Sequence, residues 1–160
     1  MNGGLEATMD SFSSLPAAQP YVISLLVLGL NLVGLANATA VSRGQAREVI
    51  NPEDQRSVQA LKVVFDDGNE VTARYRRAHR NALENTPLFL VPALALTLLG
   101  TSATLAGALF YAFAVLRVVH SVCYVKGLQP VRTIAFALSL LVQVAVLGIV
   151  VYRVLAPSGT

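Results

Sequence analysis

Four long apolar stretches dominate the 160-residue sequence, and they restrict its fold more than any other feature. They cover approximately residues 20–42, 80–100, 102–126 and 130–154. A helix needs about 20 residues to cross the hydrocarbon core of a bilayer, and each stretch reaches that length. The chain is 54% hydrophobic and only 13% charged, with a mean hydropathy of +0.60. A soluble domain needs more polar surface than this, so the composition predicts a membrane protein.

The first stretch is expected to stay in the mature protein as a spanning helix. No Lys or Arg precedes it, and its apolar run exceeds the roughly 7–15 residues of a signal-peptide core. The single cysteine, Cys123, lies in the third stretch and cannot form an intramolecular disulfide. Because the last two turns are short, neighbouring helices must be antiparallel. The predicted fold is all-α, a four-helix transmembrane bundle over residues 20–154 between a flexible N-terminal tail at 1–19 and a C-terminal tail at 155–160.

Basic residues are concentrated at one end of the predicted bundle. Eight of the twelve Lys and Arg residues lie between Arg43 and Arg80, and Lys126 and Arg132 flank the last turn. The positive-inside rule then places the basic connections in the cytoplasm and both termini on the non-cytoplasmic side. Six acidic residues also lie in the 43–79 connection, and we therefore expect no nucleic-acid partner. This multi-pass topology fits a bacterial inner membrane and the endoplasmic reticulum equally well.

The 43–79 connection is the one sizeable soluble segment. Its NPED motif at 51–54 is typical of a turn or helix start, since Pro fits the first helical turn and acidic residues stabilise it. The segment LKVVFDDGNEVTARY at 61–75 has short alternating apolar flanks around Asp67 and Gly68, which predicts a small β-hairpin. Two strands alone are marginally stable, so such a hairpin must pack on another surface.

Three of the predicted spans carry polar side chains on one face near the cytoplasmic end. A helix advances about 100° per residue, and on this basis His79 points away from the polar face of its own span. Ionisable groups inside a membrane are costly unless paired or hydrated, which makes them candidates for function. The three sets are Arg77, Arg80, Asn81 and Glu84; Arg117, His120, Ser121 and Tyr124; and Arg132, Phe136, Ser139 and Gln143.

Each of these residues also has a purely structural interpretation. Arg80 and Glu84 are four residues apart and can neutralise each other, while the arginines just before them can attract anionic lipid head groups. Tyr124 fits an interfacial aromatic belt, and His120 fits a packing histidine. Arg117 is harder to explain in this way, because it lies about two turns deep with no acidic residue of its own helix within reach.

The residue types favour a small zwitterionic ligand. Guanidinium groups bind carboxylates in a bidentate manner, so an arginine-rich pocket suits an anion. Glu84 and Asn81 suit an ammonium or amide group of the same ligand. A metal site is not expected, because neither histidine has a Cys, Asp or Glu at ligand spacing. The nucleotide-binding and serine-hydrolase motifs are missing from the sequence as well.

Three motifs together resemble a known family. They are NPED at 51–54, RRAHRNALENTPLFL at 76–90 and RVVHSVCYVKGLQPVRT at 117–133. With the four apolar stretches, they are similar to the membrane-associated proteins in eicosanoid and glutathione metabolism (MAPEG) over residues 22–154. The likeness is greatest to the branch of microsomal prostaglandin E synthases and glutathione transferases. This resemblance implies a homotrimer with glutathione sites between neighbouring subunits.

The resemblance also implies roles for individual residues. Arg80, Asn81 and Glu84 would bind the tripeptide, with Glu84 taking its ammonium group. Arg132 would hold the thiol as a thiolate, and Thr133 stands where the synthase has a serine. The other implied positions are Arg43 and Arg77 as further glutathione-site arginines, Arg117, His120 and Tyr124 in the RxxHxxxY pattern, Phe136 in place of a tyrosine, and Asp54 as a proton-transfer acid.

The implied activity is that of a glutathione transferase or peroxidase acting on lipophilic electrophiles or peroxides from the bilayer. A prostaglandin E synthase-like isomerase is a narrower alternative. A non-enzymatic lipid-binding scaffold of the same family is another, which loss of the glutathione ligand set would favour. The last alternative is a plain four-span structural protein or small transporter, which would require a polar stripe that reaches the outer leaflet.

Overall fold

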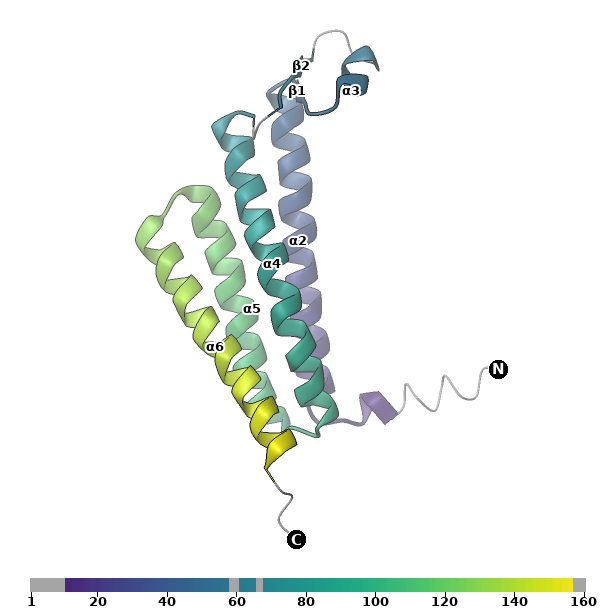
Figure 1. Cartoon of the computed structure of the whole chain (residues 1–160), viewed down its shortest axis with the longest axis vertical. Coiled ribbons are helices and arrows are strands. Elements are labelled where there is room, and N and C mark those ends of the chain that lie inside the picture. The colour runs from purple at the N-terminus through teal and green to yellow at the C-terminus, as the bar shows by residue number, and fades with distance from the viewer. Residues whose placement is uncertain (1–10, 58–60, 66–67, 157–160) are drawn as a thin grey trace, which may run out of the picture.

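The computed structural model describes residues 11–57, 61–65 and 68–156. Most of this chain forms four long helices: α2 (Ala18–Gln45), α4 (Glu70–Leu98), α5 (Ala103–Lys126) and α6 (Gln129–Leu155). The helices pack as an antiparallel bundle, with the start of α2 and the end of α6 at the same end (Figure 1). The predicted all-α class is confirmed.

Three of the helices in the described ranges are long and apolar enough to cross a membrane: α2, α5 and α6. Helix α4 is different because four arginines and Glu70 occupy its first three turns. It also begins ten residues before the predicted span at 80–100. The extra turns lengthen the helix beyond its apolar half, so α4 combines a charged first part with an apolar second part.

The predicted hairpin at 61–75 is wrong. Its second arm forms the first turns of α4, because the Asn69 side chain caps the helix by accepting hydrogen bonds from the Val71 and Thr72 amides, both at 3.1 Å. Thr72 is buried, and its hydroxyl lies 3.1 Å from that of Ser42 on α2. Asp67, at the centre of the predicted turn, lies outside the described residues.

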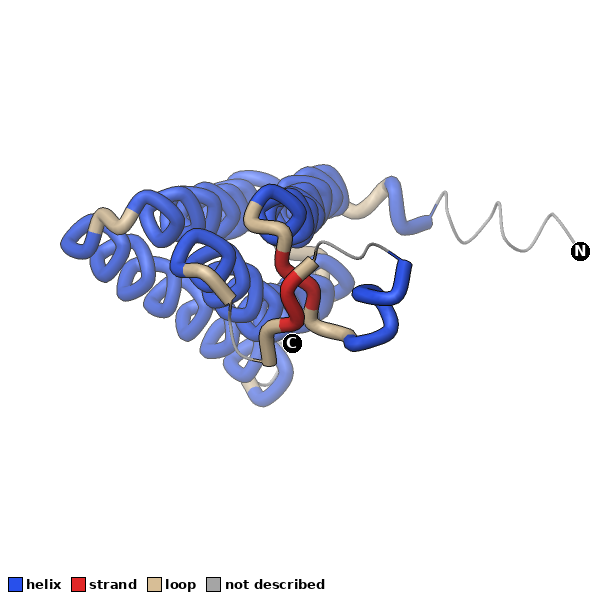
Figure 2. Tube along the Cα trace, turned by 90° about the horizontal axis from the view of Figure 1, so that it is seen from above, coloured by secondary structure: helices blue, strands red, loops and turns tan. Residues whose placement is uncertain are grey.

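The first arm of the predicted hairpin pairs with a different partner. Strand β2 (Lys62–Val63) lies parallel to β1 (Glu48–Val49), and the short helix α3 (Pro52–Ser57) packs against both strands. We call residues 46–68, where described, the cap. Figure 2 shows its two strands side by side above the bundle. The helix start predicted at NPED is confirmed.

The described part of the N-terminal tail is ordered against α2. Ala17 is fully buried, and the ring of Phe12 meets Tyr21 edge-on with centroids 6.4 Å apart. The remaining residues of the predicted flexible tail, 1–10, and residues 157–160 of the C-terminal tail lie outside the described ranges.

Aromatic packing holds the apolar half of the bundle together. Phe89 of α4 stacks on Phe113 of α5 with centroids 3.8 Å apart, and it meets Phe110 edge-on at 5.8 Å. All three rings are fully buried. Aromatic contacts of this kind add stability beyond the area they bury, which helps in a bilayer because lipid gives little hydrophobic drive for helix association.

The cap is tied to α4 by one carboxylate. Glu48 Oε2 accepts hydrogen bonds from the backbone and side-chain nitrogens of Asn69, both at 3.0 Å. These bonds lower the pKa of the Glu48 carboxyl below its ordinary value of 4.5. Gly68 adopts φ +76°, and a Cβ at this position would lie 2.6 Å from the same carboxylate oxygen. This backbone conformation and the closeness of the Glu48 carboxylate therefore favour glycine at position 68.

We predict that acid weakens the start of α4 through Glu48. Its folded-state pKa is depressed, so the stabilisation is complete above the ordinary glutamate pKa and is lost as the pH falls through the folded value. Hydrogen exchange of the Asn69–Thr72 amides, corrected for the intrinsic pH dependence, should lose protection in acid. A Glu48→Gln variant should start with less protection and show little further change. An equal loss of protection in acid in both proteins would contradict a stabilising role for the Glu48–Asn69 hydrogen bonds.

Candidate functional site

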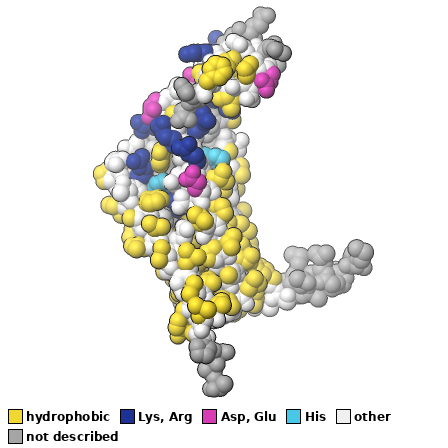
Figure 3. All heavy atoms as spheres, viewed as in Figure 1, with side chains coloured by type: hydrophobic (Ala, Val, Ile, Leu, Met, Phe, Trp, Pro, Cys, Tyr) yellow, Lys and Arg dark blue, Asp and Glu magenta, His cyan; other side chains and the backbone are white. Residues whose placement is uncertain are grey.

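Cationic side chains gather at the end of the bundle next to the cap. They come from α4, from the end of α5 and from the start of α6. Figure 3 shows them as a band between the cap and the largely hydrophobic surface of the bundle. This location matches the predicted concentration of basic residues at one end.

One cavity of about 230 Å³ opens between α4 and the α5–α6 turn. The Arg132 guanidinium carbon lies 4.6 Å from the centroid of the Tyr124 ring, a cation–π contact. Arg132 Nη2 also donates to Gln129 Oε1 at 2.5 Å. Two contacts therefore fix the guanidinium at the wall of the cavity. The lining consists of Glu70, Arg74, Arg77, Tyr124, Gly127, Gln129 and Arg132.

Glu70 partly balances the charge of this cavity. Its Oε1 accepts from Arg74 Nε at 2.9 Å and from Arg77 Nη2 at 3.1 Å. The hydrogen bond from Arg74 is the main reason that the pKa of Glu70 is lowered. Sequence reasoning missed Glu70 and Gln129. The spacing of four and seven residues from Glu70 to the two arginines was the available signal.

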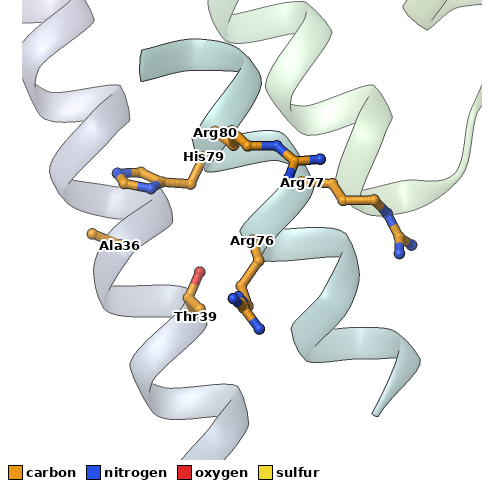
Figure 4. Close-up of a pocket in the computed structure, with 6 residues that line it drawn as sticks. All are labelled: Ala36, Thr39, Arg76, Arg77, His79 and Arg80. Atoms are coloured by element: carbon orange, nitrogen blue, oxygen red, sulfur yellow. The ribbon is translucent and has the colours of Figure 1, made fainter. Parts of the chain in front are cut away.

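A second cavity of about 340 Å³ lies between α2 and α4. It is lined by Ala36, Thr39, Arg76, Arg77, His79 and Arg80, with no carboxylate among these described residues. Figure 4 shows His79 extending toward α2 while Arg77 and Arg80 extend away from it, in agreement with the predicted opposite direction of His79. Arg77 lines both cavities.

Below the cavities, Arg117 of α5 is almost fully buried, at 1% exposure. Its Nη2 donates to the Asn81 carbonyl at 3.1 Å and to Asn81 Oδ1 at 2.5 Å. Among the residues that the structure describes, its Nε and Nη1 have no hydrogen-bond partner, and neither has Nδ1 of buried His120. Asn81 was expected to bind the ligand, and in this chain its side-chain oxygen accepts a hydrogen bond from Arg117.

The predicted polar faces of α5 and α6 meet in an aromatic cluster. The His120 ring has centroid distances of 5.8 Å to both Tyr124 and Phe136. Arg132 contacts this cluster through the Tyr124 ring. The structure thus brings together Arg77, Arg132, Tyr124, His120 and Phe136, with Arg117 and Asn81 beneath them.

Other predicted residues lie apart from this cluster. Glu84 is exposed and forms no salt bridge with Arg80 in the part of the chain that the structure describes. Thr133 is exposed and donates its hydroxyl to the Gln129 carbonyl at 3.1 Å. Asp54 lies on α3 in the cap, where it accepts from Asn51 at 3.2 Å. Arg43 is half-buried in the last turn of α2, one turn beyond Thr39.

Comparison with known proteins agrees with this architecture. A profile of the MAPEG family matches residues 21–152. Prostaglandin E synthase of Equus caballus is 31% identical over 132 residues, which cover 82% of this chain and 83% of that protein. Microsomal glutathione S-transferase 1 of Mus musculus is 36% identical over 107 residues, with coverage of 64% and 68%. The corresponding Sus scrofa protein is 37% identical over 109 residues, with coverage of 65% and 69%.

The fold and the apolar helices define an integral membrane helical bundle with a cation-lined end. The chain belongs to the MAPEG family.

We predict that Asn81 and Arg117 act as one unit. Asn81→Leu removes the side-chain acceptor of the buried guanidinium, leaves it only the backbone carbonyl of residue 81, and should lower the free energy of unfolding by about 1–3 kcal/mol. Adding Arg117→Met to this variant should restore most of the loss, because an apolar pair needs no hydrogen bonds. Thermal denaturation of the wild type, both single variants and the double variant gives the coupling. Additive losses would show that the contact is energetically unimportant.

Proposed function

We propose that the protein is a glutathione transferase or peroxidase that activates the glutathione thiol as a thiolate for attack on lipophilic electrophiles or peroxides. The supporting observation is the position of Arg132, fixed by Tyr124 and Gln129 at the wall of a cation-lined cavity. The curated relatives include proteins named microsomal glutathione S-transferase 1. Lipophilic substrates would reach this boundary from the bilayer and glutathione from the cytoplasm.

The residues present fit a zwitterionic tripeptide. Small-molecule sites usually measure about 300–1,000 Å³. The cavity of about 340 Å³ falls within that range, and the cavity of about 230 Å³, which Arg77 also lines, is somewhat smaller. Arg77 and Arg80 would pair with carboxylates, and Glu84 with the ammonium group. Nε and Nη1 of Arg117 have no acceptor among the described residues and are buried, so they would add positive charge below the site.

The chemistry rests on the charge of Arg132. A free thiol has a pKa near 8.5, so only a few per cent is ionised at neutral pH. A guanidinium within about 4 Å in a partly enclosed site favours the thiolate. Because the Tyr124 ring and Gln129 already hold Arg132, little reorganisation is needed when the thiol ionises. His120 contacts the Tyr124 ring and is itself packed against Phe136. Thr133 follows Arg132 in the sequence and would add a hydroxyl.

A homotrimer would complete the site. Arg80 and Glu84 are exposed on the protomer, and Glu84 has no salt-bridge partner in the described chain. Sites between neighbouring subunits would enclose both residues and would allow Arg43 of a second copy to contribute. We assign Asp54 no step within one protomer, because it lies on α3 in the cap, bonded to Asn51.

A glutathione-dependent isomerase is the second candidate. Its support is the 31% identity to a prostaglandin E synthase over 82% of this chain. Phe136 argues against it, because the resemblance places a tyrosine hydroxyl there. Substrate assays separate the two: isomerisation of an endoperoxide would support the isomerase, and conjugation or peroxide reduction would support the transferase.

We predict saturable glutathione binding by the purified protein in detergent, measured by calorimetry. Glu84→Ala should weaken binding by about tenfold or more, because a charge-assisted hydrogen bond is lost. Arg153→Ala is the matched control: it removes an arginine from the opposite end of α6 and should leave binding unchanged. A wild type that binds no glutathione at millimolar concentration would exclude the enzyme and leave the lipid-binding scaffold.

We further propose that all four long helices span the membrane, with both termini on the non-cytoplasmic side. Cys123 is buried, and replacing it with serine gives a background without cysteine. In that background, an impermeant maleimide should label Leu128→Cys from the cytoplasmic side and Leu99→Cys from the opposite side. Both positions are exposed, at 48% and 39%. Labelling of both from one side would rule out the third crossing between them.

A further inference from the structure

A separate apolar groove of about 310 Å³ lies between α2 and α5. It follows α2 from Asn31 to Ala38, which is about 10 Å at the usual helical rise. Val122 and Val125 of α5 form the opposite wall, and Val122 is 47% exposed. The groove therefore opens sideways on the surface of a bundle that lies in a membrane.

Small residues on α2 make this hollow. Gly34 and Ala38 are four residues apart and so lie on the same face of the helix. A Cβ built on Gly34 would meet no atom within 4 Å. A side chain can therefore begin at this position without a clash at its Cβ and extend into the groove, which makes Gly34 a suitable site for a blocking substitution.

The groove changes character along its length. At the deeper end, Asn31 Nδ2 donates to Ser121 Oγ at 3.1 Å and joins α2 to α5. At the end next to the arginines, Tyr75 and Lys126 line the groove. Lys126 is the last residue of α5, and no carboxylate is among the described lining residues. The apolar groove thus ends at the ammonium group of Lys126.

Packed side chains separate this groove from the arginine cavities. Leu35, Ala78 and Ala82 form a buried cluster, against which Tyr75 and Tyr124 pack. Tyr75 faces the groove and Tyr124 faces the Arg132 cavity. The groove and the cavities share no lining residue in the described chain.

We propose that this groove binds one acyl chain of an anionic phospholipid, with the head-group phosphate at Lys126. The charge of Lys126 and the absence of a lining carboxylate select the anion, and the Gly34–Ala38 hollow accepts the chain. The Tyr75 hydroxyl is a second donor near the head group. This inference does not depend on the glutathione chemistry and holds for the scaffold alternative as well.

Native mass spectrometry of the purified protein tests the proposal directly. After incubation with dioleoylphosphatidylglycerol, the wild type should retain one lipid per chain. Gly34→Leu should reduce this retention by at least tenfold, and Ala38→Leu provides a second block. Gly29→Leu is the matched control, because Gly29 is also on α2 with open space around it but does not line the groove. Equal loss in Gly34→Leu and Gly29→Leu would overturn the proposal.

The head-group part has its own test. A basic residue near the surface strengthens anionic-lipid binding by about fivefold. Lys126→Ala should therefore lower the preference for dioleoylphosphatidylglycerol over dioleoylphosphatidylcholine by about that factor, and Arg153→Ala should leave it unchanged. Three outcomes would overturn the proposal. The first is a lipid preference that does not change in Lys126→Ala. The second is a change of oligomeric state in Gly34→Leu, which would make the groove a subunit interface, and the third is displacement of the lipid by an electrophilic substrate, which would make the groove a substrate site.

Discussion

A guanidinium buried in a membrane bundle needs acceptors within the protein, and the rest of the cationic end depends on how Arg117 meets this requirement. Asn81 offers both its backbone carbonyl and its side-chain oxygen to Arg117 Nη2. This pair joins α4 to α5 without a carboxylate, and no salt bridge to Arg117 occurs in the described part of the chain. Arg117 and Asn81 therefore combine a fixed geometry with the positive charge of the guanidinium group. Both properties suit the recognition of an anion.

The two halves of α4 explain how a charged site and a membrane core coexist in one helix. Its apolar half packs Phe89 against α5, where the aromatic contacts stabilise the bundle. Its charged half extends past the start of α6 (Figure 1). Asn69 is the N-cap residue of this half and donates its backbone N–H to Glu48 of β1. The cap thus fixes the start of the helix that carries four of the ten arginines. We infer that its function is structural within the protomer.

Local signals in the sequence predicted part of this structure well. The bounds of α5 are within one residue of the predicted span at 102–126, because Ser102 and Gly127 are strong helix-ending residues. The polar face of Arg117, His120 and Tyr124 followed from helical spacing. Contacts between distant residues could not be predicted in this way. The start of α4 depends on Glu48, 21 residues before Asn69, and Arg117 finds its partner 36 residues away.

The central claim is that the cationic end lowers the pKa of a bound thiol through Arg132. Ultraviolet absorbance near about 240 nm reports the thiolate, and a pH titration of the protein with saturating glutathione gives the thiol pKa directly. The account predicts a value well below the free-thiol pKa of about 8.5 in the wild type, and a return toward it in Arg132→Ala at saturating ligand. A bound thiol that titrates identically in both proteins would contradict it.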